Sequence, residues 1–316
     1  MALGYLPQYL LSQLNQSYEV SRLELEADLP VFIEKHGNAF PAVVTSTFTG
    51  ICQNTIDLLP ELEIISSFGV GTDSLDIIYA NSKGIVVGNT PDVLNDDTAN
   101  MAVALLLATT RNLVANDRFI RNGLWQYGNT VPLGRSIRDK TVGLIGMGRI
   151  GSVIAEKLTV FGCHIVYHSR TKKPDVRHPY YHDLLEMART SDVLVVIVPG
   201  SPETSGLVSR EILTALGPNG TLINVARGSV VDEAALVDLL ASGRLGWAGI
   251  DVFADEPNVP ETLFSLENVV LQPHMGSATS ETRDAMADRV VANLQWHFGG
   301  KLIPKTVDPR TDRNPI

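Results

Sequence analysis

A glycine pattern between an apolar run and a helical pattern constrains this chain more than any other stretch. Residues 140–145 predict a strand, and Gly146, Gly148 and Gly151 follow with Gly-x-Gly-x-x-Gly spacing before a helical pattern over 152–161. In such a turn the first glycine permits a tight bend, the second lets backbone approach a pyrophosphate, and the third lets the helix pack on the sheet. The N–H groups at the start of the helix then face the anion.

A second apolar run, residues 164–169, completes a βαβ unit of the length that a dinucleotide site requires, although a plain strand-to-helix turn remains the alternative. An acidic residue near its end accepts from the ribose hydroxyls of NAD, whereas an arginine accommodates the 2′-phosphate of NADP. The chain carries no carboxylate there, but Ser169, Arg170, Thr171, Lys172 and Lys173. We therefore expect NADP(H) as the preferred cofactor and NAD(H) as a second option, with a solvated basic turn as the alternative.

Composition excludes several partners. The formal net charge is −10 over 316 residues, which argues against nucleic acid and anionic membranes and leaves room for two domains. Cys52 and Cys163 have no metal-type spacing, so we expect no metal site and a reducing compartment. The N-terminus lacks the pattern of a signal peptide and the run 101–108 is too short to span a bilayer, which predicts a cytoplasmic protein without a membrane partner.

The first 94 residues alternate apolar runs with helical patterns and predict an α/β layer with a parallel sheet. The expected strands are 41–45, 62–67 and 85–87, and the expected helices are 54–59 and 74–83. The second strand runs into the glycine-rich stretch 68–73, where the amides of Val70 and Gly71 could cradle a small anion. A plain turn is the alternative.

A helix is predicted from Asp96 or Asp97 to Thr110, and it is apolar almost all round. A helix without a polar face must be buried on several sides, at an inter-domain crossover or at a subunit interface. Trp125 follows in an aromatic loop, where it either packs or reaches a substrate pocket.

Three chemically capable side chains follow predicted strands in the second half of the chain. The strands are expected at 192–198, 220–226, 247–253 and 269–272, and Arg227, Glu256 and His274 lie at the exits of the last three. Ligands of open α/β sheets bind outside the carboxyl ends of the strands. Singly, these residues could be a surface cap, a solvated loop acid and a satisfied strand-end histidine.

Together they suit one reaction. A histidine can donate a proton near neutral pH, and a carboxylate beside it favours the imidazolium form. An arginine offers two parallel donors to a carboxylate and can polarise a carbonyl. Beside a nicotinamide, Arg227, Glu256 and His274 would make a reductase of 2-oxo acids.

These motifs, with others in the same order, resemble the D-isomer-specific 2-hydroxyacid dehydrogenase family along nearly the whole chain. The matching stretches are 70–73, 98–99, 146–151, 224–228, 232–236, 249–253 with 256–257, and 272–279. The resemblance implies two Rossmann-like α/β domains, a flavodoxin-like substrate domain and a dinucleotide-binding domain, with the active site in the cleft between them. It places the discontinuous substrate-binding domain at 1–95 plus 284–316 and the NAD(P)-binding domain at 96–283. It also implies a homodimer through the 97–120 region.

The resemblance also assigns roles to residues. His274 would be the acid/base, Glu256 its partner, and Arg227 the substrate anchor, with Val70, Gly71, Arg227 and His274 binding substrate. The implied cofactor contacts are Thr98, Gly146, Gly148, Arg149, Ile150, Gly151, Ser169, Arg170, Thr171, Lys172, Val198, Pro199, Thr204, Val225, Ala226, Arg227, Asp251, His274 and Gly276. Among these, Asp251 would hold the nicotinamide carboxamide.

Within the family, residues 169–172 resemble the NADPH-dependent glyoxylate/hydroxypyruvate reductases. The expected activity is therefore reduction of glyoxylate to glycolate and of hydroxypyruvate to D-glycerate by hydride transfer, with His274 as proton donor. Asn100 and Met275 depart from the usual pattern and could alter pocket shape. One alternative is a reductase of the aromatic substrate hydroxyphenylpyruvate, and another is a cofactor-sensing, co-repressor-like binding protein.

Overall fold

The computed structural model describes residues 1–23, 29–303 and 306–307. The chain divides into two compact units, one made of Met1–Leu94 with Thr279–Asn314 and the other containing Asn95–Ala278. The second crossing between the units lies at 278/279, whereas the sequence had placed it at 284. Helix α11 (Ser280–Phe298) explains this position, because the Thr279 side chain caps the helix by accepting from the Thr282 amide, and the helix packs on elements of the first unit.

The first unit contains a five-stranded parallel sheet with the order β2-β1-β3-β4-β5. This is the 2-1-3-4-5 order of flavodoxin-like folds, as expected. The strands are β1 (Ala2–Leu3), β2 (Arg22–Leu23), β3 (Ala42–Ser46), β4 (Ile64–Phe68) and β5 (Val86–Gly88).

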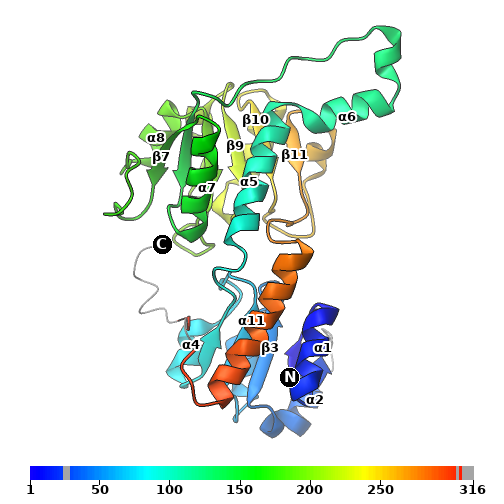
Figure 1. The fold of residues 1–316 in the computed structure, drawn as a ribbon, viewed down its shortest axis with the longest axis vertical. Helices are drawn as coiled ribbons and strands as arrows, with labels where there is room; N and C mark the ends of the chain where they lie inside the picture. The colour runs from blue at the N-terminus through cyan, green and yellow to red at the C-terminus, as the bar shows by residue number, and fades with distance from the viewer. Residues whose placement is uncertain (24–28, 304–305, 308–316) are drawn as a thin grey trace. The chain divides into compact units, whose positions relative to one another are not determined.

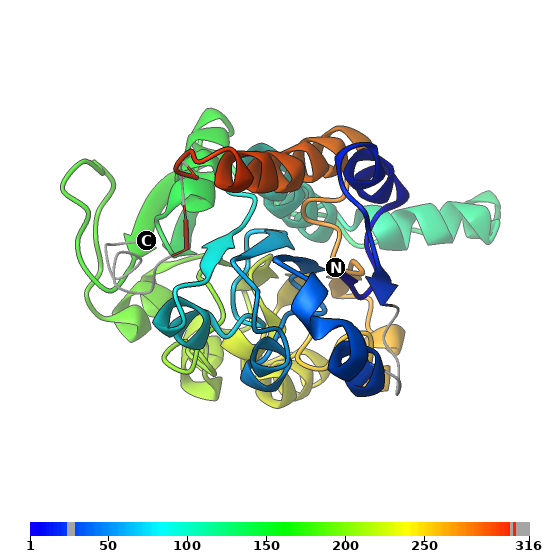
Figure 2. The same ribbon diagram turned by 90° about the horizontal axis from the view of Figure 1, so that it is seen from below.

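Helices cover both faces of this sheet, with α1 and α11 on one side and α2 and α4 on the other (Figure 2). Besides α11 they are α1 (Gln8–Ser17), α2 (Leu29–His36), η1 (Gly37–Ala39), α3 (Gln53–Asp57) and α4 (Ile77–Ser82). The core strands β3 and β4 are buried along almost their whole length, as parallel strands between two helical layers must be.

The second unit contains a six-stranded parallel sheet with the order β11-β10-β9-β8-β6-β7. The strands are β6 (Thr141–Ile145), β7 (His164–His168), β8 (Val193–Val196), β9 (Thr221–Asn224), β10 (Trp247–Ile250) and β11 (Val269–Leu271). The order reverses between β6 and β8, because the chain leaves β6 to β7 on one side and returns to β8 on the other. In such a doubly wound sheet this switch point is where a dinucleotide binds. The prediction of a Rossmann-type domain is confirmed.

The helices of the second unit flank this sheet (Figure 1). They are α5 (Asn95–Thr110), α6 (Leu113–Arg121), η2 (Leu124–Tyr127), α7 (Arg149–Val160), α8 (Leu184–Thr190), α9 (Arg210–Leu216), η3 (Gly228–Val230), α10 (Glu233–Ala241) and η4 (Glu261–Ser265). Helix α5 packs on α7 and on β9, β10 and β11, so its apolar surface is largely buried within its own unit. Within the described ranges, no helix has both the length and the apolar character that a membrane crossing requires.

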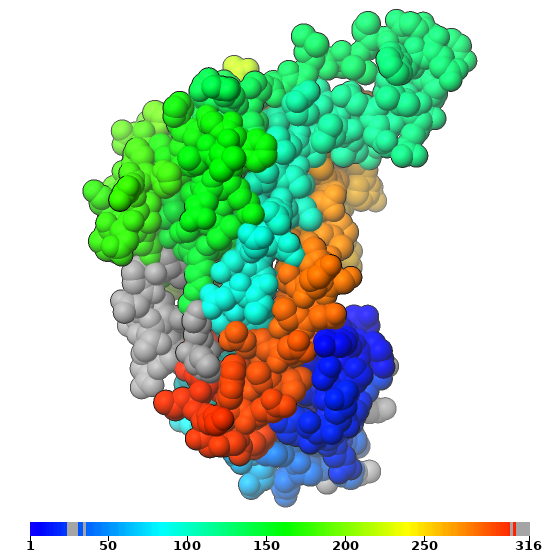
Figure 3. All heavy atoms as spheres, viewed as in Figure 1, coloured from blue at the N-terminus to red at the C-terminus, as the bar shows by residue number. Residues whose placement is uncertain are grey.

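One segment of the second unit stands out from its body (Figures 1 and 3). We call residues 113–133 the arm; it comprises α6, η2 and the extended stretch that follows. Helix α6 contains no buried residue. The arm exposes seven large apolar side chains, namely Leu113, Ile120, Leu124, Trp125, Tyr127, Val131 and Leu133. Such a concentration of exposed apolar surface is typical of an interaction site.

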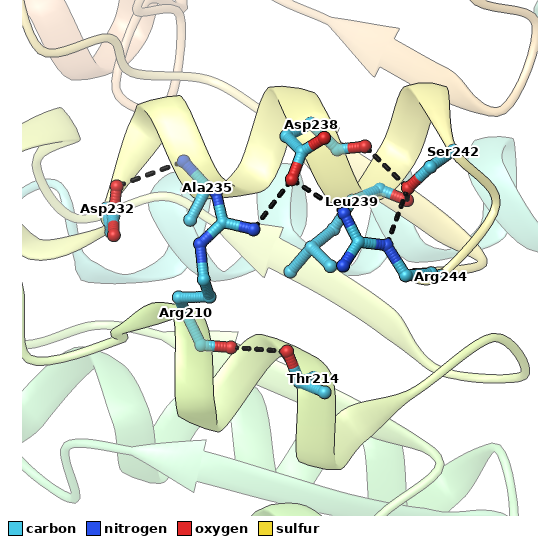
Figure 4. A network of polar contacts seen from close by, with 8 residues as sticks. All are labelled: Arg210, Thr214, Asp232, Ala235, Asp238, Leu239, Ser242 and Arg244. Atoms are coloured by element: carbon cyan, nitrogen blue, oxygen red, sulfur yellow. Dashed lines mark hydrogen bonds and ion pairs between the residues drawn. The ribbon is translucent and has the colours of Figure 1, made fainter.

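A surface network joins α9 and α10 (Figure 4). One carboxylate oxygen of Asp238 accepts from Arg210 at 2.6 Å and from Arg244 at 2.7 Å. The Ser242 hydroxyl accepts from Arg244 and donates to the carbonyl of Asp238. These contacts hold together two helices that cover the buried strands β8 and β9.

Candidate active site

Arg227, Glu256 and His274 follow three adjacent strands. Arg227 comes after β9, Glu256 after β10 and His274 after β11, and these strands are neighbours in the sheet. Because all of them are parallel, their carboxyl ends lie at one edge. The structure therefore brings the three residues that the sequence selected to the same edge of the second unit.

His274 and Glu256 form a direct pair. The imidazole Nδ1 lies 2.8 Å from Glu256 Oε2, and both side chains are about one-quarter exposed, 27% and 25%. Glu256 Oε1 accepts from the Phe253 amide at 3.0 Å, which fixes the carboxylate plane. Burial alone would raise the pKa of Glu256, but the hydrogen bonds from His274 and Phe253 and the charges of His274 and Arg227 outweigh it, so the pKa is lowered. Glu256 is therefore ionised near neutral pH.

Asp251 holds the turn that carries His274. Its backbone carbonyl accepts from the His274 amide at 2.8 Å, and its carboxylate accepts from the amides of Met275 and Gly276 at 2.7 and 2.8 Å. His274 has a φ of 56°, which is uncommon for a residue with a side chain and is maintained by these three bonds. Burial raises the pKa of Asp251 although both amides and the charge of His274 act in the opposite direction.

The loop after β9 is shaped by one asparagine and one glycine. Asn224 Oδ1 accepts from the Ala226 amide at 3.1 Å, and Asn224 Nδ2 donates to the Arg227 carbonyl at 3.0 Å. A Cβ on Gly228 would lie 1.9 Å from the carbonyl carbon of Phe253, so only glycine lets the β9 and β10 exits meet. Arg227 and the Glu256 loop are thereby held side by side.

The glycine fingerprint has the geometry of a nucleotide turn. Gly146 has a φ of 109°, and a Cβ there would lie 2.6 Å from the Ile197 carbonyl oxygen. A Cβ on Gly151 would lie 2.5 Å from the Gly146 oxygen, so the helix approaches the strand exit closely. Gly148 precedes Arg149, the first residue of α7, and the start of a helix after such a turn suits an anion. The helix begins three residues earlier than the apolar spacing had indicated.

Other expected cofactor contacts surround this edge. The Cβ position of Gly276 lies 3.0 Å from Asp251 Oδ2 and 3.8 Å from the Thr98 hydroxyl. After β8, the Thr204 hydroxyl donates to the Pro199 carbonyl at 2.7 Å and accepts from the Ser201 amide, so it shapes the turn that follows Val198. Further expected contacts also lie at strand exits or at the start of α7, namely Ile150, Val225 and Ala226.

The basic turn after β7 is internally braced. Ser169 is buried and its hydroxyl donates to the Thr171 carbonyl, while the Lys173 amide donates to the Tyr167 hydroxyl. Arg170, Thr171 and Lys172 are exposed. Lys173 is only 9% exposed, and burial together with the charge of Arg170 lowers its pKa.

The first unit presents Val70 and Gly71 in the loop after β4, at the carboxyl end of its own sheet. Both residues are partly accessible. In the part of the chain that the structure describes, no group of three His, Cys, Asp or Glu side chains is arranged to hold a metal ion.

Sequence reasoning missed the roles of Asp251 and Asn224 as braces of the active-site loops. Asp251 contacts residues that are 24 and 25 positions further along the chain, whereas Asn224 joins a loop to the strand that precedes it. The only local signal is a buried polar residue at the end of an apolar strand, and that signal does not identify the partner.

The comparisons with known proteins agree with this geometry. Residues 103–276 match the model of the D-isomer specific 2-hydroxyacid dehydrogenase, NAD binding domain. A glyoxylate/hydroxypyruvate reductase A from Arabidopsis thaliana is 47% identical over 93% of this chain and 94% of its own length. A hydroxyphenylpyruvate reductase from Plectranthus scutellarioides is also 47% identical, over 93% of each chain.

A solved structure is similar along almost the entire chain. It is an NADPH-dependent glyoxylate/hydroxypyruvate reductase from Sinorhizobium meliloti in complex with NADP and malonate. It is 43% identical, with a TM-score of 0.92 over 97% of this chain and 95% of that one. The fold and the site define a nicotinamide-dependent oxidoreductase. The chain belongs to the D-isomer specific 2-hydroxyacid dehydrogenase family, and its second unit contains the NAD(P)-binding domain.

Proposed function

We propose that this chain is an NADPH-dependent reductase of small 2-oxo acids, with glyoxylate and hydroxypyruvate as substrates. The observation that carries the proposal is the 2.8 Å pair between His274 and Glu256 beside Arg227, at the edge where the nucleotide fingerprint also lies. The activities named for the relatives in Arabidopsis and Sinorhizobium support the same substrates.

The residues divide the work as follows. When bound, the reduced nicotinamide would supply a hydride, that is, a proton with two electrons, to the keto carbon. His274 gives a proton to the carbonyl oxygen, and because Nδ1 contacts Glu256, the proton leaves from Nε2. Arg227 binds the substrate carboxylate and polarises the carbonyl. Val70 and Gly71, after β4 of the first unit, offer backbone N–H groups that suit a carboxylate, and we therefore assign substrate binding to the first unit.

A reductase of hydroxyphenylpyruvate is the second candidate. It is favoured by the Plectranthus relative, whose identity to this chain is the same 47%. The proton donor and the arginine serve either substrate equally, so the two activities differ only in the size of the substrate side chain.

Initial rates with glyoxylate, hydroxypyruvate and hydroxyphenylpyruvate, each with NADPH, test the proposal. We expect the two small acids to be preferred, and His274→Ala to lower turnover about 100- to 10,000-fold while NADPH binding persists. Preference for the aromatic acid would move the assignment to the second candidate. NADPH binding without turnover of any acid would indicate a cofactor-sensing binding protein instead.

We further propose that NADP(H) is preferred over NAD(H). The turn after β7 offers a hydroxyl and cations where a 2′-phosphate would lie. Its residues are Ser169, Arg170, Thr171 and Lys172, followed by Lys173. The internal bonds of this turn support the idea, because a braced loop loses little entropy when it binds an anion.

Arg170→Ala should lower kcat/KM with NADPH roughly 10- to 100-fold, because a charge-assisted contact is lost. The value with NADH should change less than about twofold, because NADH has no 2′-phosphate. Arg189→Ala, at an exposed position of α8, removes the same charge elsewhere and is the control. An equal loss with both cofactors would mean that Arg170 does not contact the phosphate.

We also propose that the chain forms a homodimer, with the arm as part of the interface. The expected region, 97–120, includes α5 and α6. Since α5 is already largely buried within its unit, the exposed apolar surface lies mainly on α6 and the rest of the arm. A second copy of the same chain would cover this surface.

The molar mass in solution tests the dimer. We expect twice the 34.3 kDa of one chain for the wild type, and a shift toward monomer for the double variant Ile120→Asp/Leu133→Asp. Ile120 and Leu133 are 57% and 95% exposed, and Ile78 on α4, at 74%, provides the matched control Ile78→Asp. A monomeric wild type would refute the proposal, as would a dimer unaffected by the double variant.

A further inference from the structure

The loop that follows β4 is held through two consecutive carbonyl groups. The Gly69 carbonyl accepts from the Thr90 amide at 3.0 Å, and the Val70 carbonyl accepts from Asn89 Nδ2 at 2.9 Å. Asn89 and Thr90 follow β5, which is the neighbour of β4 in the sheet. The segment after β5 therefore holds the loop after β4 in place.

A hydrogen bond that fixes a carbonyl group also fixes the direction of the N–H group in the same peptide unit. In a trans peptide the C=O and the following N–H point in opposite directions. The Thr90 bond to Gly69 therefore directs the Val70 N–H away from the 89–90 segment, and the Asn89 bond to Val70 does the same for the Gly71 N–H. Among the described residues, neither N–H donates to another group of the protein. Both therefore remain available to a ligand.

The backbone of Asn89 is itself held by a residue of helix α11. Asn293, only 1% exposed on α11, donates from Nδ2 to the Asn89 carbonyl at 3.1 Å and contacts the Ser66 hydroxyl at 3.3 Å. Ser66 in turn donates to the Val290 carbonyl. A Cβ on Gly88 would lie 2.9 Å from Asn293 Nδ2, so the absence of a side chain at Gly88 leaves room for the Asn293 carboxamide. The backbone of Asn89 is thus fixed by α11, and the Asn89 side-chain donor is attached to this fixed backbone.

We propose that Asn89 is a positioning residue that, through the Val70 carbonyl, aims the Gly71 N–H at the carboxylate of the 2-oxo acid. This proposal rests on the proposed function of the same site. It makes the side chain of Asn89 a determinant of selectivity for substrates that carry a carboxylate. The Val70 N–H is aimed by a backbone bond, so only the Gly71 half of the pair can be released by a side-chain substitution.

Asn89→Ala and Asn89→Asp test the proposal, since alanine removes the donor and aspartate places a negative charge against the Val70 carbonyl. We expect the Kd of oxalate for the enzyme–NADPH complex, and the KM for glyoxylate, to rise about tenfold or more. The kcat and the Kd of NADPH should stay within about twofold, because neither the proton donor nor the nucleotide turn is touched.

Asn81→Ala is the matched control, because Asn81 Nδ2 also donates to a carbonyl of the first unit, that of Val307, without contacting the 69–71 loop. It should leave the oxalate Kd unchanged. An unchanged oxalate Kd in both Asn89 variants would overturn the proposal, as would a wild type that binds no oxalate. A loss of NADPH affinity and of thermal stability as large as the loss of oxalate affinity would assign Asn89 a merely structural role. Oxalate binding that depends on Asn89, in an enzyme that reduces no 2-oxo acid, would refute the proposed function alone.

Discussion

The Asp251 carboxylate positions the proton donor on which the candidate active site depends, because it ties the exit of β10 to the turn after β11. Its two oxygens accept from the amides of Met275 and Gly276, and this clamp keeps His274 at a φ of 56° with Nδ1 against Glu256. A buried carboxylate is costly unless its hydrogen bonds are made. Here the bonds that compensate for burial are the same bonds that position the proton donor.

In both units, an asparagine side chain holds the backbone of a loop at the candidate site. Asn224 fixes the Arg227 loop of the second unit, and Asn89 fixes the Val70 carbonyl of the first. In each case a carboxamide at a strand exit sets the direction of neighbouring peptide groups, which a loop without such a contact would leave mobile. Donors aimed in advance need not reorganise when charge develops on a substrate, which is the physical basis of electrostatic catalysis.

Much of the fold could be predicted from sequence, because the longer parallel strands are continuous apolar runs and the glycine turn has fixed spacing. The dinucleotide-type sheet and the shared edge of Arg227, Glu256 and His274 followed from local patterns. Strands β1 and β2 have only two residues each and carry no periodic signal. The Asp251 and Asn293 contacts join residues far apart in sequence, so no local pattern reveals them. The apolar surface of α5 indicated burial correctly but could not identify what covers it.

The pH dependence of reduction by Glu256→Gln tests most directly the claim that the Glu256 carboxylate holds His274 as a proton donor. The pKa of Glu256 is lowered, so the carboxylate is charged wherever the imidazolium is needed. Without that charge, the pH above which kcat/KM for glyoxylate declines should be lower than in the wild type, while Glu261→Gln on η4 should leave it unchanged. A wild-type pH profile in Glu256→Gln, with activity lowered equally at every pH, would contradict the account.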